Sequence, residues 1–463
     1  MAGEEMEAAV DAYLDEGRER FEEELKAFLR IPSVSTESRY REEVARCAEW
    51  LRDHIREAGI DSAEVIPTSG HPIVLAEHRG DPEALTVLVY GHYDVQPVDP
   101  EEEWTSAPFE ATERDGCLYA RGAVDDKGQV HMHLKALEAL LRSRDELPVN
   151  VKLVIEGEEE VGSKALEAFL AERQDRLACD CVLISDTGMF SPELPCITTG
   201  LRGIVYTEIT VRGPGSDLHS GTYGGAVVNP ANALCELVAR LKDEEGRATV
   251  PGFYDRVRPI TETERQELGA LPFDEEEFRR GVGAPALGGE AGHGTLERLW
   301  YRPTLDVNGL LAGFTGEGAK TVLPATAMAK VSMRLVPDQE PAEIAAAFEA
   351  HVRRLAPPGV TVEVRHYHGG EPWAAEPRHP VYRAAQTALE EAFGSPPAFI
   401  REGGSIPIVN LFEKTFSAPV LLVGFALPGS NLHAPDEWID LSVYHRGIRA
   451  LARLYEGLAG SRP

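Results

Sequence analysis

Three apolar segments of this chain each end in histidine or acidic residues, and this repetition constrains the fold more than any other feature. The segments and the polar residues that follow them are residues 85–90 with His92 and Asp94, residues 149–155 with Glu159 and Glu160, and residues 181–184 with Asp186. Short apolar runs of this kind are typical of strands buried on both faces of a parallel sheet. In an open α/β sheet, ligands and catalytic groups gather beyond the carboxyl ends of the strands. We therefore expect these polar side chains to meet at one edge of a sheet and to form a functional site.

The length and charge of the chain exclude several classes of protein. A chain of 463 residues exceeds what one hydrophobic core usually supports and predicts two domains. The formal net charge of −31 argues against nucleic acid or an anionic membrane as a partner, because both require clustered Lys and Arg. The N-terminal segment lacks the features of a signal peptide, and no apolar run reaches about 18 residues. We expect a cytoplasmic protein, and we expect reduced cysteines because the six cysteines are scattered.

The order of predicted helices and strands indicates an inserted domain. Up to about residue 200, strands alternate with helical patterns such as residues 42–58 and 127–142, as they do in a parallel sheet. The later segments instead alternate like half-exposed strands and amphipathic helices: strands at 204–211, 327–336 and 360–366, and helices at 229–242 and 341–355. This pattern predicts a small α+β domain with a four-stranded antiparallel sheet. Residues 245–300 are interpreted as an irregular surface excursion.

We therefore expect a two-domain α/β protein. The first domain, residues 1–203 and 377–463, would contain a mixed, mostly parallel sheet flanked by helices and would carry the site. A helix at 381–393 and a strand at 420–425 return the chain to this domain. Residues 204–376 would form the inserted domain.

Five short motifs lie in order between residues 91 and 437. They are GHYDVQP at 91–97, GAVDDKG at 122–128, EEEVGS at 158–163, DLHSG at 217–221 and NLHAPDE at 431–437. Together they resemble the M20 metallopeptidase family, and most closely its dipeptidase branch, which includes the carnosine and Cys-Gly dipeptidases. Five ordered motifs are a far more specific signal than any one of them. The resemblance implies a homodimeric hydrolase with two divalent metal ions per subunit, in which the inserted domain serves as a lid and dimerisation surface.

The resemblance also implies a ligand for each metal position. Asp125 would bridge the two ions, His92 and Asp186 would complete the ligands of one ion, and Glu160 and His433 those of the other. Two ions about 3.5–4 Å apart need such a bridging carboxylate. Imidazole and carboxylate groups suit zinc, and manganese and cobalt accept similar sets. Zinc or manganese is therefore expected, with cobalt possible.

Two further acidic residues are implied to support these ligands. Glu159 would act as the general base that takes a proton from water and returns it to the leaving amine. Asp94 would hold the second ring nitrogen of His92. Because residues 158–160 are all glutamate, a shift of one residue between these roles stays open. The resemblance also implies a cis peptide bond directly after Asp125.

The inserted domain is implied to supply substrate contacts. His219 would reach the site of the neighbouring subunit and stabilise the oxyanion of the tetrahedral intermediate. Arg334 would bind the substrate carboxylate, with Thr321 and Ser405 as hydroxyl partners. The lid would close to exclude water. Without the resemblance, a structural ion pair explains Arg334 equally well, and a surface loop explains His219.

The leading function is hydrolysis of a dipeptide with release of a free C-terminal amino acid. The same ligands would serve an N-acyl amino acid deacylase, such as those acting on acetylornithine or succinyl-diaminopimelate, and a non-catalytic metal-binding protein is a third alternative. Specificity depends on pocket shape rather than on these motifs. His131 and His133 are two residues apart on a predicted helix, so they do not share a face and are not expected to chelate together.

Overall fold

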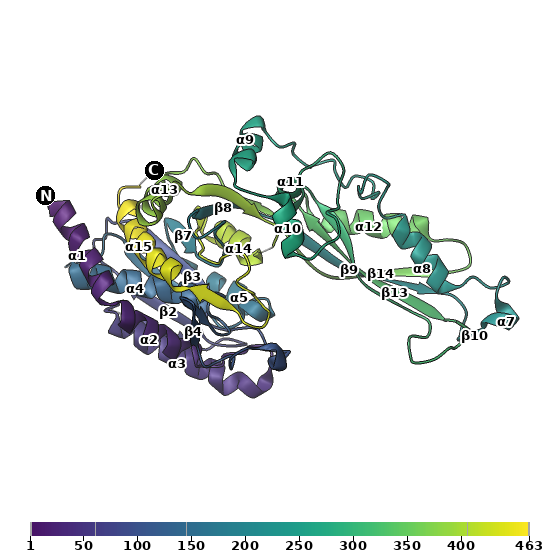
Figure 1. Ribbon diagram of the computed structural model, residues 1–463, viewed down its shortest axis with the longest axis horizontal. Coiled ribbons are helices and arrows are strands. Elements are labelled where there is room, and N and C mark those ends of the chain that lie inside the picture. Colours follow the sequence, from purple (N-terminus) through teal and green to yellow (C-terminus); the bar gives the residue numbers. More distant parts are fainter. Residues whose placement is uncertain (1, 61, 145, 405, 462–463) are drawn as a thin grey trace. The chain divides into compact units, whose positions relative to one another are not determined.

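The chain forms two compact units (Figure 1). The structure is a computed structural model, and it describes residues 2–60, 62–144, 146–404 and 406–461. Unit 1 comprises Met1–Thr199, Ala375–Ile400 and Ile408–Pro463, and unit 2 comprises Gly200–Ala374 and Arg401–Pro407. Within the described ranges, no helix combines the length and apolar character needed to cross a membrane. The expected α/β class is confirmed.

Unit 1 contains a mixed sheet whose parallel strands lie in the centre. In spatial order the strands are β1 Ser62–Ile66, β2 Ile73–His78, β6 Asn150–Glu156, β3 Thr86–His92, β7 Cys181–Ile184, β17 Val420–Leu422 and β8 Cys196–Leu201, with β16 Ala398–Glu402 on β8. Pairing is parallel from β6 through β3 and β7 to β17, and antiparallel for β1–β2, β2–β6 and β17–β8. Strands β6, β7 and β17 are buried throughout. The sheet is therefore mixed but less parallel than expected. The short connection between β1 and β2 permits only an antiparallel pair there.

Helix α4 is the central helix of unit 1 (Figure 1). The helices are α1 Ala2–Glu16, α2 Arg18–Leu29, α3 Arg41–Glu57, α4 Lys127–Ser143, α5 Leu166–Glu172, α6 Gln174–Leu177, α13 Pro380–Phe393, α14 Pro407–Phe416 and α15 Leu441–Leu458, with short 3₁₀ turns η1 Ser38–Tyr40, η2 Glu101–Glu103 and η3 Glu159–Val161. Helix α4 packs against α1, α2, α15 and β3, and most of its residues are buried. Its glycine at 128 is required, because a Cβ there would overlap the carbonyl oxygen of Ala123. A small sheet of β4 Thr112–Arg114, β5 Cys117–Tyr119 and β18 Trp438–Asp440 completes the unit.

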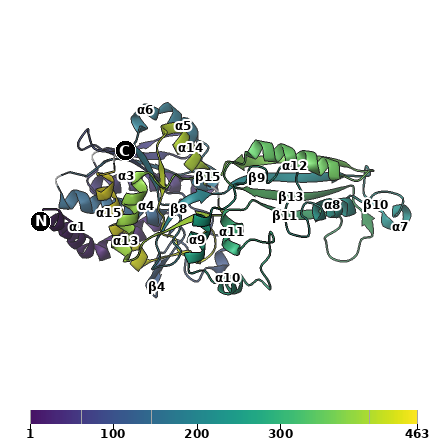
Figure 2. The same cartoon turned by 90° about the horizontal axis from the view of Figure 1, so that it is seen from above.

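Unit 2 contains a four-stranded antiparallel sheet with helices packed on it (Figure 2). The sheet strands, in spatial order, are β11 Thr304–Ala312, β13 Thr326–Leu335, β9 Gly203–Arg212 and β14 Thr361–Gly370. The other elements are β10 Leu218–His219, β12 Val322–Leu323, β15 Trp373–Ala374, α7 Ser220–Tyr223, α8 Pro230–Ala239, α9 Glu262–Ala270, α10 Glu275–Gly281, α11 Thr295–Trp300 and α12 Pro341–Leu355. Alternating residues of β9 and β13 are buried, which is the period expected of strands with one covered face.

The ends of the insertion lie side by side. The main-chain nitrogen of Ala375 donates a hydrogen bond of 2.9 Å to the carbonyl oxygen of Thr199. Just inside unit 2, β15 pairs with the end of β8 through Trp373 and Leu201. The chain therefore leaves unit 1 and returns to it at neighbouring positions.

The segment 245–300 is more ordered than the sequence interpretation of an irregular excursion allowed. It contains α9, α10 and α11. Thr261 and Glu264 form a reciprocal capping box at the start of α9, and Asp274 caps α10. The buried carboxylate of Glu290 forms ion pairs with Arg247 and Arg302 at 2.8 and 2.6 Å. These local caps and ion pairs order the segment despite the many glycines between residues 281 and 294.

One buried carboxylate holds the loop that precedes α4. Glu437 is fully buried, and its Oε2 accepts hydrogen bonds from Arg121 NH1 at 2.8 Å and from the main-chain nitrogen of Gly122 at 3.0 Å. Its Oε1 accepts from the main-chain nitrogens of Val124 at 3.0 Å and Asp125 at 3.1 Å. The peptide bond that follows this loop, Asp125–Asp126, is cis, which confirms that expectation. Glu437 thus fixes the backbone of the loop that carries Asp125.

We expect Glu437→Gln to destabilise the fold strongly. The substitution removes one charge and leaves the guanidinium of Arg121, 1% exposed, without its buried counter-charge. Breaking a buried ion pair from one side costs about 3–5 kcal/mol in the free energy of unfolding. Urea unfolding of the full chain measures this loss.

The neighbouring Asp436 provides the matched control. Its carboxylate, 25% exposed, bonds Arg114 at 3.3 Å and the main-chain nitrogen of Thr105 at 3.0 Å. Asp436→Asn is expected to cost less than about 1 kcal/mol, because an exposed ion pair contributes little. Equal losses for the two variants would show that Glu437 does not have this role.

Candidate metal centre and active site

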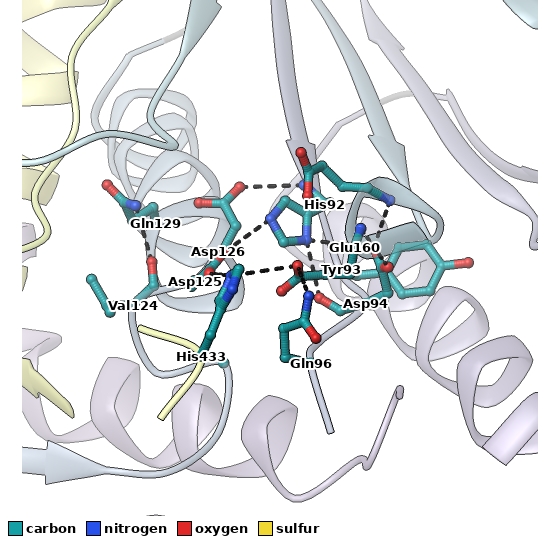
Figure 3. Close-up of polar contacts among 12 residues, drawn as sticks. His92, Tyr93, Asp94, Gln96, Val124, Asp125, Asp126, Gln129, Glu160 and His433 are labelled. Carbon is teal, nitrogen blue, oxygen red and sulfur yellow. Dashed lines mark hydrogen bonds and ion pairs between the residues drawn. The ribbon is translucent and has the colours of Figure 1, made fainter. Parts of the chain in front are cut away.

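Asp125 lies between two imidazoles (Figure 3). Its Oδ1 is 3.2 Å from Nε2 of His92, and its Oδ2 is 2.9 Å from Nε2 of His433. His92 ends the central strand β3, Asp125 precedes α4, and His433 lies in the loop before β18. Nε2 of His433 also lies 3.5 Å from Oε2 of Glu160 in η3. The two oxygens of one carboxylate therefore face two separate groups of side chains.

These side chains form two groups that share Asp125. The first contains His92, Asp125 and Asp186, and the second contains Asp125, Glu160 and His433. Within each group, one ligand atom per residue lies within 4.8 Å of the others. The structure thus brings together all five residues for which the sequence suggested a metal-binding role, in the same two sets.

The charges in this cluster are poorly balanced without a cation. Burial, followed by the charge of Asp125, raises the pKa of Glu160 to about 8. Burial also raises the pKa of Asp126 to about 8 and that of Asp186 well above its ordinary value. Crowded buried carboxylates retain protons in this way when positive charge is lacking. Nε2 of His92 is buried, and its contact is the 3.2 Å ion pair with Oδ1 of Asp125. Imidazoles and several carboxylates are therefore crowded together, which is the donor set of a divalent cation site.

Asp125 behaves in the opposite way to the other carboxylates. Burial would raise its pKa, but the contacts with His433 and His92 hold that pKa well below the ordinary value. The hydrogen bond with Asp125 raises the pKa of His433 to about 8. Burial would lower the pKa of His92, yet Asp125 and Asp94 raise it well above its usual range. Asp125 is therefore the carboxylate that stays ionised at the centre of the cluster.

Asp94 has a second contact that the sequence did not suggest. Nδ1 of His92 lies 3.0 Å from the main-chain oxygen of Asp94 and 3.4 Å from its Oδ1. The carboxylate also accepts hydrogen bonds of 3.2 Å from the main-chain nitrogens of Glu159 and Glu160. Asp94 therefore orients both the imidazole and the turn that carries the two glutamates. This second contact depends on how the turn at Glu159 and Glu160 folds against Asp94, and no local sequence pattern indicates that.

Among the consecutive glutamates, Glu160 is the one that joins the second group. Besides its approach to His433, Oε2 of Glu160 accepts a hydrogen bond of 2.6 Å from Nε2 of Gln96. Burial raises the pKa of the adjacent Glu159. Gln96 lies in the GHYDVQP motif, but the sequence does not indicate its contact because Glu160 is remote in the chain.

The expected substrate-binding residues lie in unit 2. His219 ends β10, is exposed, and accepts a hydrogen bond of 3.1 Å at Nδ1 from the main-chain nitrogen of Gly221. The main-chain oxygen of Thr321 accepts a bond of 3.1 Å from Ser220, so Thr321 lies beside His219. Arg334 lies near the end of β13, where burial lowers its pKa. Ser405 lies outside the described residues.

Comparisons with known proteins agree with this arrangement. Residues 88–457 match the peptidase family M20/M25/M40. The chain is 34% identical to the Cys-Gly metallodipeptidase dug1 of Schizosaccharomyces pombe, over 97% of this chain and 98% of that protein. It is also similar to the crystal structure of human carnosine dipeptidase 1, with a TM-score of 0.84 and 32% identity over 98% of this chain and 99% of the other. The M20 metallo-carboxypeptidase Sso-CP2 of Sulfolobus solfataricus gives a TM-score of 0.84 and 34% identity over 94% of this chain and 98% of the other. The chain therefore belongs to the peptidase family M20/M25/M40.

Proposed function

We propose that this protein is a metal-dependent dipeptidase that releases a free C-terminal amino acid. The observation that carries the proposal is the pair of ligand groups sharing Asp125. The printed names of relatives such as the Cys-Gly metallodipeptidase of Schizosaccharomyces pombe and the Beta-Ala-His dipeptidase of Homo sapiens support a dipeptide as substrate. Hydrolysis of an N-acyl amino acid would use the same metal ligands. The comparison of dipeptide and N-acyl amino acid substrates described below distinguishes the two activities.

The five clustered residues would hold two divalent ions, zinc or manganese, with cobalt also accepted by such ligands. His92, Asp125 and Asp186 would bind one ion, and Asp125, Glu160 and His433 the other. Divalent ions held there would supply a Lewis acid for the scissile carbonyl and would lower the pKa of a bound water molecule. The raised pKa values of His92 and Glu160 support this assignment, because a divalent cation would take the place of the protons that these crowded groups retain.

The proton transfers are assigned to Glu159. Its pKa is raised by burial, so it is suited to take a proton from water during attack and to return it to the leaving amine. Asp94 would position Glu159 through the hydrogen bond to its main-chain nitrogen. Asp94 is therefore a positioning residue for both the glutamate turn and His92.

His219 and Arg334 are proposed to serve one substrate from two different subunits. Strand β12, which pairs with β10 at His219, ends three residues before β13 begins, and Arg334 is the ninth residue of β13. At about 3.3 Å per residue, the strand separates Thr326 from Arg334 by roughly 26 Å. In both views β10 and α7 lie at one end of the four-stranded sheet (Figures 1 and 2). One dipeptide cannot bridge this length, so in a homodimer one subunit would supply His219 for the oxyanion, with the adjacent Thr321, while Arg334 of the other subunit binds the substrate carboxylate.

The first test compares substrates and metals. Metal-free protein reloaded with zinc, manganese or cobalt is expected to release amino acids from a dipeptide library faster than from an N-acyl amino acid library. Glu159→Gln should lower kcat by about 10²–10⁴-fold with unchanged metal content, because it removes only the general base. Glu158→Gln is the matched control and should retain activity. Preference for the acylated library would make the protein a deacylase, and full activity of Glu159→Gln would contradict its role.

Metal binding is expected to release protons. Glu160 and His433 each have a pKa of about 8 without metal, so both carry a proton near neutral pH. A ligand must be deprotonated, so metal affinity should rise from about pH 6 to about pH 9 and then level off. Calorimetric titration in two buffers of different ionisation enthalpy measures the released protons. Absence of proton release at neutral pH would contradict the ligand assignment of these two residues.

Mixed dimers test the role of His219. A His219→Ala chain and a Glu159→Ala chain are each expected to be inactive alone. If His219 acts on the neighbouring subunit, one of the two sites in each heterodimer contains both residues, and an equal mixture should regain about a quarter of wild-type activity. The control is the Glu159→Ala chain alone, taken through the same subunit-exchange procedure. No recovery in a mixture with proven heterodimers would place His219 in its own subunit.

A further inference from the structure

A third group of metal-ligating side chains lies in unit 1, on three helices that supply no ligand to the two groups sharing Asp125. Glu24 of α2, His54 of α3 and His131 of α4 each offer one ligand atom, and these atoms lie within 4.8 Å of one another. The neighbouring His133 is not involved, because its two ring nitrogens contact the hydroxyls of Tyr455 and Ser185, each at 2.8 Å. His131 therefore meets a histidine of another helix rather than its neighbour in the sequence.

The two histidines direct unpartnered nitrogens into the protein. Nε2 of His54 and Nε2 of His131 are buried and have no hydrogen-bond partner in the part of the chain that the structure describes. The residues are 6% and 0% exposed. Nε2 of His54 is 3.7 Å from Oε2 of Glu24, which is too long for a hydrogen bond. Buried polar atoms are rarely left in this condition, so a group that pairs with both nitrogens is expected.

Neighbouring rings fix the orientation of both imidazoles. His54 is stacked between Trp50 and His131, with ring centroids 4.6 and 5.3 Å apart. Nδ1 of His131 lies 2.7 Å from the hydroxyl of Tyr444, which leaves Nε2 as its available nitrogen. The nitrogens are therefore held in place by packing, as metal ligands are.

Both imidazoles are neutral at physiological pH. Burial, followed by the charge of Lys135, lowers the pKa of His54 to about 4 and that of His131 well below its ordinary value. The neutral form carries the lone pair that binds a metal. One ligand atom of each imidazole and one carboxylate oxygen lie within 4.8 Å of one another, which is the spacing of a site that could hold a divalent cation.

The surrounding charges allow Glu24 to leave Arg20 and Lys135 and to bind a cation instead. Oε1 of Glu24 accepts from Arg20 at 2.7 Å, and its Oε2 accepts from Lys135 at 2.6 Å. Both cationic groups also bond Glu138, at 2.7 and 2.5 Å, so they stay paired when Glu24 moves. A cavity of about 470 Å³ adjoins the group, and its lining includes four carboxylates and three cationic side chains. Excess positive charge therefore does not exclude a divalent ion.

We propose that Glu24, His54 and His131 bind a divalent first-row cation, such as zinc, at a third site separate from the catalytic cluster. Zinc–nitrogen distances of about 2.0–2.1 Å place tetrahedral ligand atoms roughly 3.4 Å apart, so Glu24 must move closer to the histidines than the 3.7 Å that separates it from Nε2 of His54. Its side chain is flexible and 25% exposed, and water from the cavity supplies the fourth ligand. The ion would tie α2, α3 and α4 together and stabilise the folded chain by mass action.

Metal stoichiometry tests the third site. The full chain, treated with chelator and then equilibrated with zinc, is expected to bind three equivalents per subunit. Glu24→Gln and His54→Gln should bind two and should retain the catalytic activity of the zinc-loaded protein. His445→Gln is the matched control, because His445 pairs with Glu22 at 2.7 Å and should leave three equivalents. Two equivalents in the unaltered chain, or three in His54→Gln, would overturn the proposal.

Cobalt spectroscopy provides a second readout that is independent of the catalytic site. In a chain carrying His92→Ala and Asp125→Ala, one equivalent of cobalt should still bind and give the absorption of a tetrahedral site. Adding Glu24→Gln should abolish that absorption. Glu24 is partly exposed, so this variant is expected to fold, and circular dichroism checks it. Unchanged cobalt absorption after Glu24→Gln would exclude this residue as a ligand and overturn the proposal.

Discussion

The carboxylate of Asp125, held between His92 and His433, is the interaction on which the rest of the structure depends. Those two histidines come from opposite ends of the chain, and they meet only because the central sheet and the loop before β18 are both complete. The backbone of Asp125 is in turn fixed by Glu437, four residues beyond His433. The same short loop thus supplies a side chain to the cluster and supports the residue at its centre.

Gathering buried carboxylates lowers the stability of the fold, and the raised pKa values identify the carboxylates that are most destabilised in their charged form. Asp126, Glu160 and Asp186 retain protons because burial and mutual repulsion disfavour their charged forms. A fold that gathers these groups does so for a purpose other than stability, since apolar residues of similar size would pack more favourably. The dense hydrogen bonding around Asp94 and Glu437 stabilises the arrangement against this repulsion.

The sequence predicted the parts of the fold that follow local rules. The helix expected at 341–355 is α12, and the strand expected at 327–336 is β13 to within one residue, because both have regular apolar periodicity. Strand β11 was missed, since its exposed Leu310 and Leu311 disguise the alternating pattern. The antiparallel outer strands of unit 1 were also missed, because strand direction depends on connections rather than on composition.

In the site, too, the sequence indicated features that depend on local patterns but not those that depend on tertiary contacts. Residues at strand ends and in motifs, such as His92 and Asp186, could be named from the sequence, and they lie together. The contacts of Asp94 with the glutamate turn, of Gln96 with Glu160, and of His131 with His54 depend on tertiary geometry and left no local signal.

The adjacent ends of the insertion, at Thr199 and Ala375, have a consequence for biosynthesis. Strand β17 and helices α13 and α15, which complete unit 1, emerge from the ribosome only after the long segment Gly200–Ala374 of unit 2. Until then β7 lacks its neighbour β17, and the nascent N-terminal half cannot close its core. His92, Asp125 and Asp186 are made early, but His433 comes last. The second ligand group therefore cannot form on an unfinished chain, which ties assembly of the catalytic centre to completion of synthesis.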